Sequence, residues 1–345
     1  MSDDRILLSH GDGGQLMADL VARVFVSRLG TGEPEGDDAA RLREVEGRGQ
    51  ETSSCPTRLV FTTDAFVVDP IFFAGGDIGR LAVCGTVNDL AAAGAIPISL
   101  SASFILEEGL PISDLERIVD SMAATAQEAD VHVICGDTKV VPRGKADRLY
   151  ISTSGVGEVP DGISVSGANA QPGDAVIVSG PVGDHGLAVL SRREGLEFES
   201  EIVSDCAPLA GMVQHLLAAV PEVHALRDPT RGGLATALNE IARQSGVEIE
   251  VDEGAVPVRP AVLAACDLLG LDPLYAANEG KMVVILPADQ AEAALAALRA
   301  HPLGRNAVII GQVSKGREGR VLLKTALGSH RILDRHVGEQ MPRIC

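Results

Sequence analysis

Two side chains of opposite charge follow a run of β-forming residues near the middle of the chain. The run, VHVICGDTKVV at Val131–Val141, is rich in β-branched residues up to Cys135 and is then interrupted by Gly136. This pattern predicts a buried strand that ends at the glycine and a loop that carries Asp137 and Lys139. The two side chains are two residues apart and share one side of an extended chain, so they could bind a metal-bound polyphosphate.

Other carboxylates stand beside small or apolar residues rather than within charged runs. They belong to the predicted loops at Asp37 and Asp38, at Asp64, and at Asp89. Each Asp alone is typical of a turn or a helix cap, because its side chain accepts hydrogen bonds from nearby backbone groups. Three or four converging carboxylates would instead bind Mg²⁺, which prefers oxygen ligands and commonly also takes phosphate oxygens. The combination favours a Mg²⁺ and phosphate site.

The common motifs for nucleotide binding and hydrolysis are absent from the sequence. It contains no GxxxxGK[ST], no GxGxxG, no HExxH and no GxSxG. A P-loop, a dinucleotide-binding turn, a zinc protease helix and a nucleophile elbow are therefore excluded by pattern. Phosphate chemistry would have to use the carboxylates described above.

Composition narrows the class of protein. The 345 residues have a formal net charge of −19, with 48 acidic and 29 basic residues and no Trp. Such a chain repels nucleic acid and lacks aromatic stacking platforms. No stretch is apolar enough for a signal peptide or a membrane span, so we expect a cytoplasmic protein without nucleic-acid or membrane partners. The cysteines have no ligand-like spacing and are expected to be reduced: Cys55, Cys84, Cys135, Cys206, Cys266 and Cys345.

Alternating strand and helix patterns predict two α/β domains. In the first half, strands at Leu59–Thr62 and Leu149–Val159 flank a helix at Asp77–Ala93 and a second helix started by a capping box of Ser113 and Glu116. The polar, turn-rich segment Asp161–Gly173 separates this half from a second series of strands and helices. We divide the chain into a leader and helix at 1–40, a first domain at 41–160, a second domain at 161–325 and a tail at 326–345.

Eight motifs together resemble the HypE family of hydrogenase maturation factors. That family belongs to the superfamily of aminoimidazole ribonucleotide synthetase, selenophosphate synthetase and thiamine monophosphate kinase. The superfamily accounts for the Asp motifs, and the terminal PRIC is the part typical of HypE. The motifs are GDDAA at Gly36–Ala40, TTDAF at Thr62–Phe66, GGDIGR at Gly75–Arg80, VNDLAAAGA at Val87–Ala95, CGDTKV at Cys135–Val140, DPTRGGLA at Asp228–Ala235, NEGK at Asn278–Lys281 and PRIC at Pro342–Cys345.

The resemblance implies a PurM-like fold with mixed sheets, in which the first domain forms a β-barrel across a homodimer and the tail is mobile. It also implies ATP and Mg²⁺ bound between the domains. The implied reaction starts with a carbamoyl group transferred by HypF to the C-terminal thiol. ATP-dependent dehydration makes a thiocyanate, and the cyanide passes to iron on the HypC–HypD complex.

The resemblance also assigns roles to residues. It implies Asp37, Asp38, Asp64, Asp89 and Asp137 as metal ligands. It implies Cys345 as the carrier, and Lys139 or Glu279 as the base. Asp228 would bind the nucleotide from the second domain, together with Asp38, Asp64, Asp89, Asp137 and Lys139.

The choice of base depends on pKa values. Lys139 would have to be neutral, which requires burial or neighbouring cations, and in its charged form it could bind phosphate instead. Glu279 is ionised at neutral pH unless it is buried and is the easier base. A tail of fifteen residues spans at most roughly 50 Å, so Cys345 can reach a site at the domain junction.

Two other functions are compatible with the sequence. One is phosphorylation of a free small amide or phosphate-bearing substrate, which would need a basic pocket and no role for Cys345. The other is a nucleotide-sensing adaptor without turnover, which would bind ATP and dock its tail onto partners.

Overall fold

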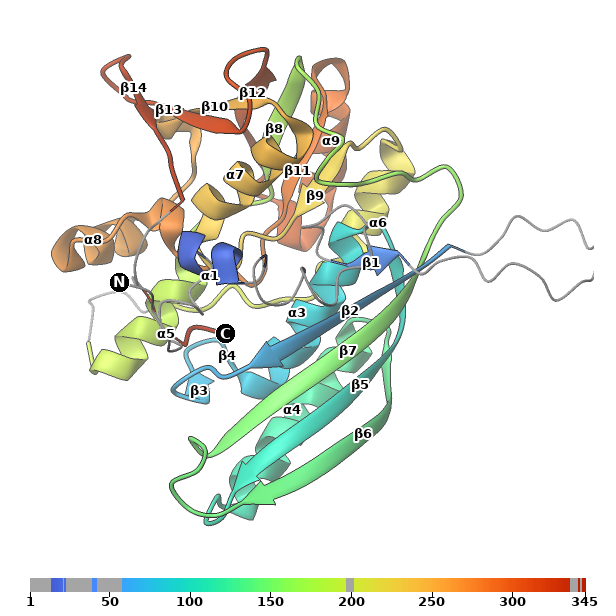
Figure 1. Cartoon of the computed structure of the whole chain (residues 1–345), viewed down its shortest axis with the longest axis vertical. Coiled ribbons are helices and arrows are strands. Elements are labelled where there is room, and N and C mark those ends of the chain that lie inside the picture. The colour runs from blue at the N-terminus through green and yellow to red at the C-terminus, as the bar shows by residue number, and fades with distance from the viewer. Residues whose placement is uncertain are drawn as a thin grey trace, which may run out of the picture.

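The computed structural model describes residues 14–20, 22, 39–41, 58–196, 202–335, 341 and 343–345. Within these ranges the chain forms two α/β domains, one above the other in Figure 1, each built on a mixed sheet. The predicted two-domain α/β organisation is therefore confirmed. A short helix, α1 (Gln15–Leu20), precedes the first domain.

The first domain contains a five-stranded sheet in the order β1-β2-β7-β5-β6. Neighbouring strands are antiparallel except β5 and β6, which are parallel and are connected through helix α4. Strands β3 and β4 form a separate hairpin. The bounds are β1 Ala40–Arg41, β2 Arg58–Phe66, β3 Phe72–Phe73, β4 Gly76–Asp77, β5 Ile96–Glu107, β6 His132–Val141 and β7 Leu149–Val159.

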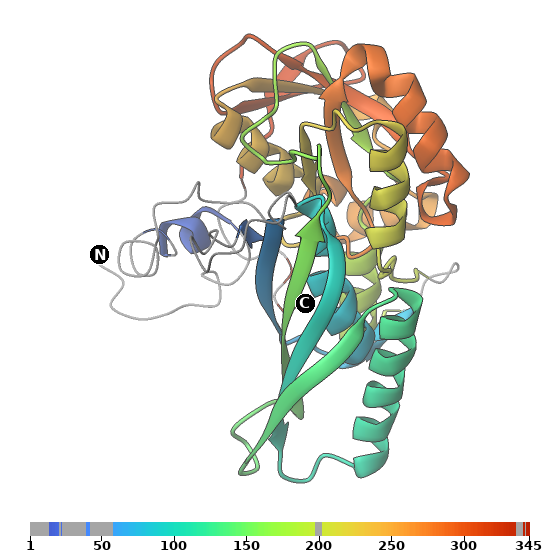
Figure 2. The ribbon, with the colours of Figure 1, turned by 90° about the vertical axis from the view of Figure 1, so that its right-hand side faces the viewer.

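Helix α3 (Ile78–Ala92) belongs to the first domain and packs against the second. Its first turn is capped by Asp77, whose carboxylate accepts hydrogen bonds from the backbone N–H groups of Gly79 and Arg80 at 2.8 and 3.1 Å. Helix α4 (Ile112–Glu128) packs beside it, and both helices lie on one face of the sheet (Figure 2). Gly79 permits the close approach, because a Cβ atom there would lie 2.4 Å from the carbonyl oxygen of Ile118. Nearly all of α3 is buried between this sheet and the second domain.

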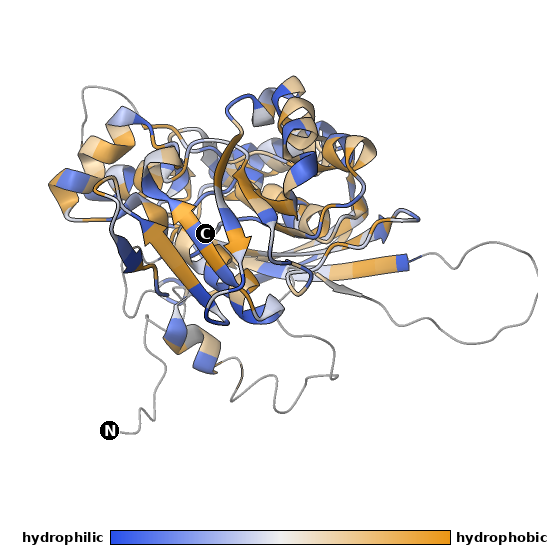
Figure 3. Cartoon of the chain, turned by 90° about the horizontal axis from the view of Figure 1, so that it is seen from above, coloured by the Kyte–Doolittle hydropathy of each residue, from blue (hydrophilic) through white to orange (hydrophobic). Residues whose placement is uncertain are grey.

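The second domain contains a seven-stranded sheet in the order β14-β13-β10-β12-β8-β11-β9. Its central strands are apolar on both sides and appear largely orange in Figure 3. This pattern is typical of strands covered by helices on both faces. The bounds are β8 Asp174–Val178, β9 Ala225–Arg227, β10 Glu248–Asp252, β11 Val283–Pro287, β12 Val308–Ser314, β13 Arg320–Lys324 and β14 His330–Ile332.

Helices cover the two faces of this second sheet. Residues of α7 pack with Val176 and Val178 of β8 in one apolar cluster, whereas α6 and α9 pack with Ala175 and Ile177 in another. The bounds are α5 Asp184–Glu194, α6 Ala210–Ala219, α7 Gly233–Ser245, α8 Pro260–Leu269 and α9 Ala291–Ala300, with 3₁₀ turns at Glu253–Ala255, Pro273–Tyr275, Ala288–Gln290 and Pro302–Gly304.

The predicted end of the strand at Gly136 is wrong, as β6 shows. It continues through Gly136, Asp137 and Lys139, so these residues do not form a loop. Gly136 is needed within the strand because a Cβ atom there would lie 2.3 Å from the carbonyl oxygen of Ala102, next to a register shift between β5 and β6. Asp64 likewise lies inside β2. Asp89 lies inside α3, so neither belongs to a loop.

Two element boundaries also differ from the predictions. Helix α4 begins at Ile112 after Pro111 without a side-chain cap, so the predicted capping box is wrong. The chain beyond residue 325 is not only a tail, because β14 pairs with β13 and Leu333 is fully buried. The second domain therefore extends past its predicted end.

Candidate active site

The last three residues of the chain lie between the two domains (Figure 1). The carbonyl oxygen of Cys345 accepts a hydrogen bond from the N–H of Val67 at 3.1 Å, and that of Arg343 accepts one from Asp69 at 3.2 Å. Val67 and Asp69 directly follow β2, so the tail docks along the continuation of this strand. Tail mobility stays a prediction; in this structure the terminus is docked.

Helix α5 of the second domain holds the same residues from the other side. The Nε2 atom of His185 lies 3.0 Å from the carbonyl oxygen of Ile344, and Nη2 of Arg193 donates to the carbonyl oxygen of Arg343 at 2.6 Å. The Ile344 side chain is 3% exposed and joins the main apolar core. Both domains therefore position Cys345.

The Cys345 thiol is surrounded by ionisable side chains from both domains. The pKa of the thiol is raised to about 12, mainly by burial; the guanidinium of Arg231 opposes this, and the carboxyl groups of Glu279, Asp64 and Asp228 add to it. The thiolate is the nucleophilic form of cysteine. A docked Cys345 is therefore a neutral, unreactive thiol at neutral pH.

Glu279 follows the last turn before β11 and is only 2% exposed. Its Oε1 atom has no hydrogen-bond partner among the described residues. Burial raises the pKa of Glu279 well above its ordinary value, and the neighbouring Cys206 thiol and Asp228 carboxyl raise it further. The surroundings of Glu279 therefore favour the protonated carboxyl, whereas an exposed glutamate would be the ionised base that the sequence analysis considered.

Asp64 from β2 and Asp228 from the loop after β9 face each other across the domain interface. Burial raises the pKa of Asp228 to about 7, and the Asp64 charge adds to this effect while Arg227 opposes it. Burial also raises the pKa of Asp64, and Arg231 opposes this. A partly buried and a buried carboxyl group close enough for one to raise the pKa of the other are suited to share a cation.

Arg231 is a site residue that the sequence analysis did not single out. It precedes α7 in a turn where Gly232 and Gly233 have φ angles of 75° and 60°. The thiol of Cys345 raises the pKa of Arg231 most, followed by the carboxyl groups of Asp64 and Glu279. The motif DPTRGG contained this arginine, but nothing in the local sequence indicated that it faces the other domain.

Asp89 lies at the margin of this cluster. Its carboxylate accepts a hydrogen bond from Oγ1 of Thr62 at 2.7 Å and lies close enough to Arg231 to raise the pKa of the guanidinium. The structure thus brings together four predicted residues: Asp64, Asp89, Asp228 and Glu279 around Cys345.

Asp137 and Lys139 are not part of this cluster within one chain. They form an exposed ion pair of 2.5 Å on β6, at the far edge of the first sheet. Their side chains are 63% and 70% exposed, so neither is buried within one chain. Asp37 and Asp38 lie outside the described residues.

No preassembled metal site is present within the described ranges. No three His, Cys, Asp or Glu side chains converge as they would around a bound ion. The five-ligand Mg²⁺ site remains a prediction, and two of its members lie outside these ranges.

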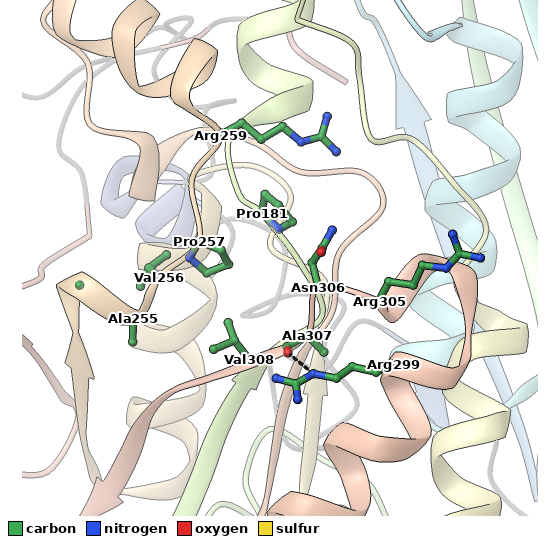
Figure 4. Close-up of a pocket in the computed structure, with 11 residues that line it drawn as sticks. Pro181, Ala255, Val256, Pro257, Arg259, Arg299, Arg305, Asn306, Ala307 and Val308 are labelled. Carbon is green, nitrogen blue, oxygen red and sulfur yellow. Dashed lines mark hydrogen bonds between the residues drawn. The ribbon is translucent and has the colours of Figure 1, made fainter.

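A separate cavity of about 680 Å³ opens on the second domain (Figure 4). Arg259, Arg299 and Arg305 line it, and Nε of Arg299 donates to the carbonyl oxygen of Ala307 at 2.9 Å. None of the predicted site residues lines this cavity.

Comparison with known proteins places this geometry in a family. Residues 36–159 match the N-terminal domain model of AIR synthase related proteins, and residues 171–324 match the corresponding C-terminal domain. The chain is 54% identical over 341 residues to the carbamoyl dehydratase HypE of Cupriavidus necator, covering 99% of this chain and 95% of that protein. The chain belongs to the HypE family.

Solved HypE structures have the same fold. The chain matches a chain in the crystal structure of a HypE–HypF complex with 46% identity and a TM-score of 0.85, covering 92% of this chain and 99% of that chain. It also matches HypE in complex with ATP with 48% identity and a TM-score of 0.81, covering 99% and 100%. The predicted family and PurM-like fold are thus confirmed. No helix within the described ranges is both long and apolar enough to cross a bilayer.

Proposed function

We propose that this chain dehydrates a carbamoyl group on its own Cys345, as the name carbamoyl dehydratase states for its HypE relatives. The S-carboxamide loses its oxygen and two N–H protons and becomes an S-cyanate, the source of cyanide for the iron of [NiFe]-hydrogenase. The docking of Cys345 among Arg231, Glu279, Asp64 and Asp228 carries this proposal. A free-substrate kinase would give no reason to bury the terminal thiol.

The residues around the thiol supply the charges that this reaction needs. The Arg231 guanidinium lies beside the sulfur and can bind an anionic group at the carboxamide oxygen. Glu279 is the better candidate for the proton transfers, because its carboxyl group lies in the cluster around the Cys345 thiol. Lys139 is exposed and is ranked second as the base.

The cluster fits Mg²⁺ and a phosphate group. The Asp64 carboxylate disfavours ionisation of Asp228, and the buried Oε1 of Glu279 has no hydrogen-bond partner among the described residues. Asp64 and Asp228 would hold the cation, with Asp89 beside them. When bound, Mg-ATP supplies the phosphoryl group that makes the carboxamide oxygen a leaving group.

Partners follow from the reaction and from relatives. A HypE relative was crystallised in complex with HypF, which supports HypF as the carbamoyl donor for this chain. The HypC–HypD complex is proposed as the cyanide acceptor. Both transfers require Cys345 to leave the docked position, since it is held between the two domains there. The described cysteines form no disulfides, which supports the predicted cytoplasmic location.

We also propose that the first domain dimerises through its open sheet. The face away from α3 and α4 exposes large apolar side chains of β2 and β5, which a second sheet would cover. Asp137 and Lys139 lie on β6 of this surface, so their predicted roles require a second copy to bring them to a cluster. The exposed apolar residues are Phe61, Ile96, Ile98 and Ile105.

Intact mass spectrometry tests the proposed function directly. The purified protein is incubated with HypF, carbamoyl phosphate and ATP, and then with fresh Mg-ATP. We expect a gain of one carbamoyl group followed by the loss of one water. Both changes should be absent in Cys345→Ala and present in Cys135→Ala, which removes an exposed cysteine instead.

Two outcomes would contradict the proposal. Adducts of equal yield in Cys345→Ala would place the carbamoyl group elsewhere. ATP hydrolysis driven by free amides or phosphates, with no adduct on the wild type, would assign the chain to free-substrate chemistry.

A further inference from the structure

His185 is a buried side chain that the proposed chemistry does not use. It is the second residue of α5 and is 0% exposed. Its Nδ1 atom lies 2.8 Å from Oγ of Ser204, and its Nε2 atom lies 3.0 Å from the carbonyl oxygen of Ile344. The ring also packs edge-on against Phe73, with centroids 5.3 Å apart and planes at 89°. Contacts on three sides fix its orientation.

The hydrogen bonds determine which ring nitrogen carries the proton. Burial lowers the pKa of His185, which favours the neutral ring. A neutral imidazole donates from one nitrogen and accepts at the other. The Ile344 carbonyl can only accept, so Nε2 donates to it and Nδ1 accepts from the Ser204 hydroxyl. The backbone N–H of Cys206 in turn donates to the Ser204 oxygen at 3.1 Å.

This chain of hydrogen bonds ends next to the carrier residue. The Ile344 carbonyl belongs to the peptide group that begins Cys345, and the Ile344 side chain is buried in the core. Val67 binds the Cys345 carbonyl at the other end of the residue. The backbone of Cys345 is thus held on both sides, which limits where its sulfur can lie relative to Arg231 and Glu279.

We propose that His185 is a positioning residue for the dehydration step. It fixes the peptide group before Cys345 and thereby places the carbamoylated sulfur against Arg231 and Glu279. His185 touches no reacting atom and acts only through Ile344. This inference rests on the proposed role of Cys345 as the carrier.

The hydrogen bond from His185 to Ile344 exists only while the tail is docked, so it can affect only one of the two reaction steps. Carbamoyl transfer requires the tail to be outside the docked position, whereas dehydration requires it to be inside. Loss of His185 should therefore slow dehydration and leave carbamoyl transfer unchanged. A general loss of folding would reduce both steps.

The test measures the two steps in His185→Ala and His185→Gln, with His215→Gln as the control. His215 is an exposed histidine on α6 of the same domain. Carbamoyl transfer from HypF is followed by intact mass, and single-turnover dehydration is then started with Mg-ATP. We expect dehydration in His185→Ala to slow by roughly 10- to 100-fold, because small misplacements of a reacting group cost this much. His185→Gln keeps an N–H donor and should be slowed less.

Alkylation of Cys345 provides a second readout, because a merely structural role would not change it selectively. The docked thiol should react faster with iodoacetamide in His185→Ala than in the wild type or in His215→Gln. Unchanged dehydration and alkylation in His185→Ala would refute the positioning role alone. An equal loss of both reaction steps would also refute it, whereas a wild type that accepts no carbamoyl group would refute the proposed function.

Discussion

The buried environment of Asp228 makes the stability of the folded protein depend on pH. Folding transfers it from water into a buried position, which raises its pKa from 3.8 to about 7. The folded state favours the protonated form of this carboxyl group. The contribution of Asp228 to the free energy of unfolding is therefore most favourable below about pH 4, and it is lost as the pH rises through about 7. Such a shift corresponds to roughly 4 kcal/mol. The cluster is therefore destabilising at neutral pH without a cation.

This loss of stability with rising pH gives a prediction for the nucleotide-free, chelator-treated protein. Its melting temperature should fall between about pH 5 and about pH 8, and Asp228→Asn should remove most of this fall, because the amide does not ionise. Differential scanning calorimetry at both pH values measures the effect. Asp120→Asn on α4 is the control, since Asp120 is exposed and distant from the cluster. Parallel pH profiles for wild type and Asp228→Asn would contradict the assignment.

At the scale of elements, α3 of the first domain is hydrogen-bonded to the second domain through the side chain of Asn88. The amide Nδ2 donates to the carbonyl oxygens of Ala207 and Glu279, both at 3.2 Å, and Oδ1 accepts from the N–H of Leu209 at 2.8 Å. Asn88 is fully buried, so its removal leaves three backbone groups of the second domain without these partners.

We therefore expect Asn88→Ala to lower the free energy of unfolding by about 2–4 kcal/mol. Denaturant unfolding followed by circular dichroism measures the change. Asn306→Ala, which truncates an exposed amide labelled in Figure 4, should change it by less than about 0.5 kcal/mol. Equal effects in the two variants would show that the interdomain bonds contribute little.

The elements also show what a single sequence can predict. Strand β7 has the predicted bounds, because its apolar and polar residues alternate regularly. Strand β6 was predicted to end at Gly136, since a glycine that serves close strand packing has the same local pattern as a turn glycine. Strands β9 and β14 have only three residues each and give no periodic signal.

The site was predictable to a similar extent. Asp64, Asp89, Asp228, Glu279 and Cys345 were identified through motifs, and the fold brings them together. Arg231 and His185 were missed because their roles depend on contacts with the other domain and with the terminus. Asp137 and Lys139 have the residue types for phosphate chemistry, but β6 places them at the edge of the sheet.

At the scale of the whole molecule, the open sheet predicts the oligomeric state. Ile98 and Ile105 on β5 are 48% and 43% exposed on the face that the helices leave uncovered. We expect the wild type to be a dimer by light scattering coupled to size-exclusion chromatography. The double variant Ile98→Asp and Ile105→Asp should shift it to the monomer, because buried charges at an apolar interface are unfavourable.

Leu327→Asp is the matched control for this experiment. Leu327 is an equally apolar side chain, 97% exposed, on the second domain. This variant should remain a dimer. A wild type that stays monomeric at all concentrations tested would show that the apolar face serves another purpose.

The docked thiol has a consequence for the chemical lifetime of the protein. Peroxides attack the thiolate form of exposed cysteines and convert it first to sulfenic acid and then to irreversibly oxidised species. While it is docked, Cys345 is partly protected from this damage, because it is partly buried and its raised pKa disfavours the thiolate. The position proposed for dehydration would thus also slow oxidation of the thiol between turnovers.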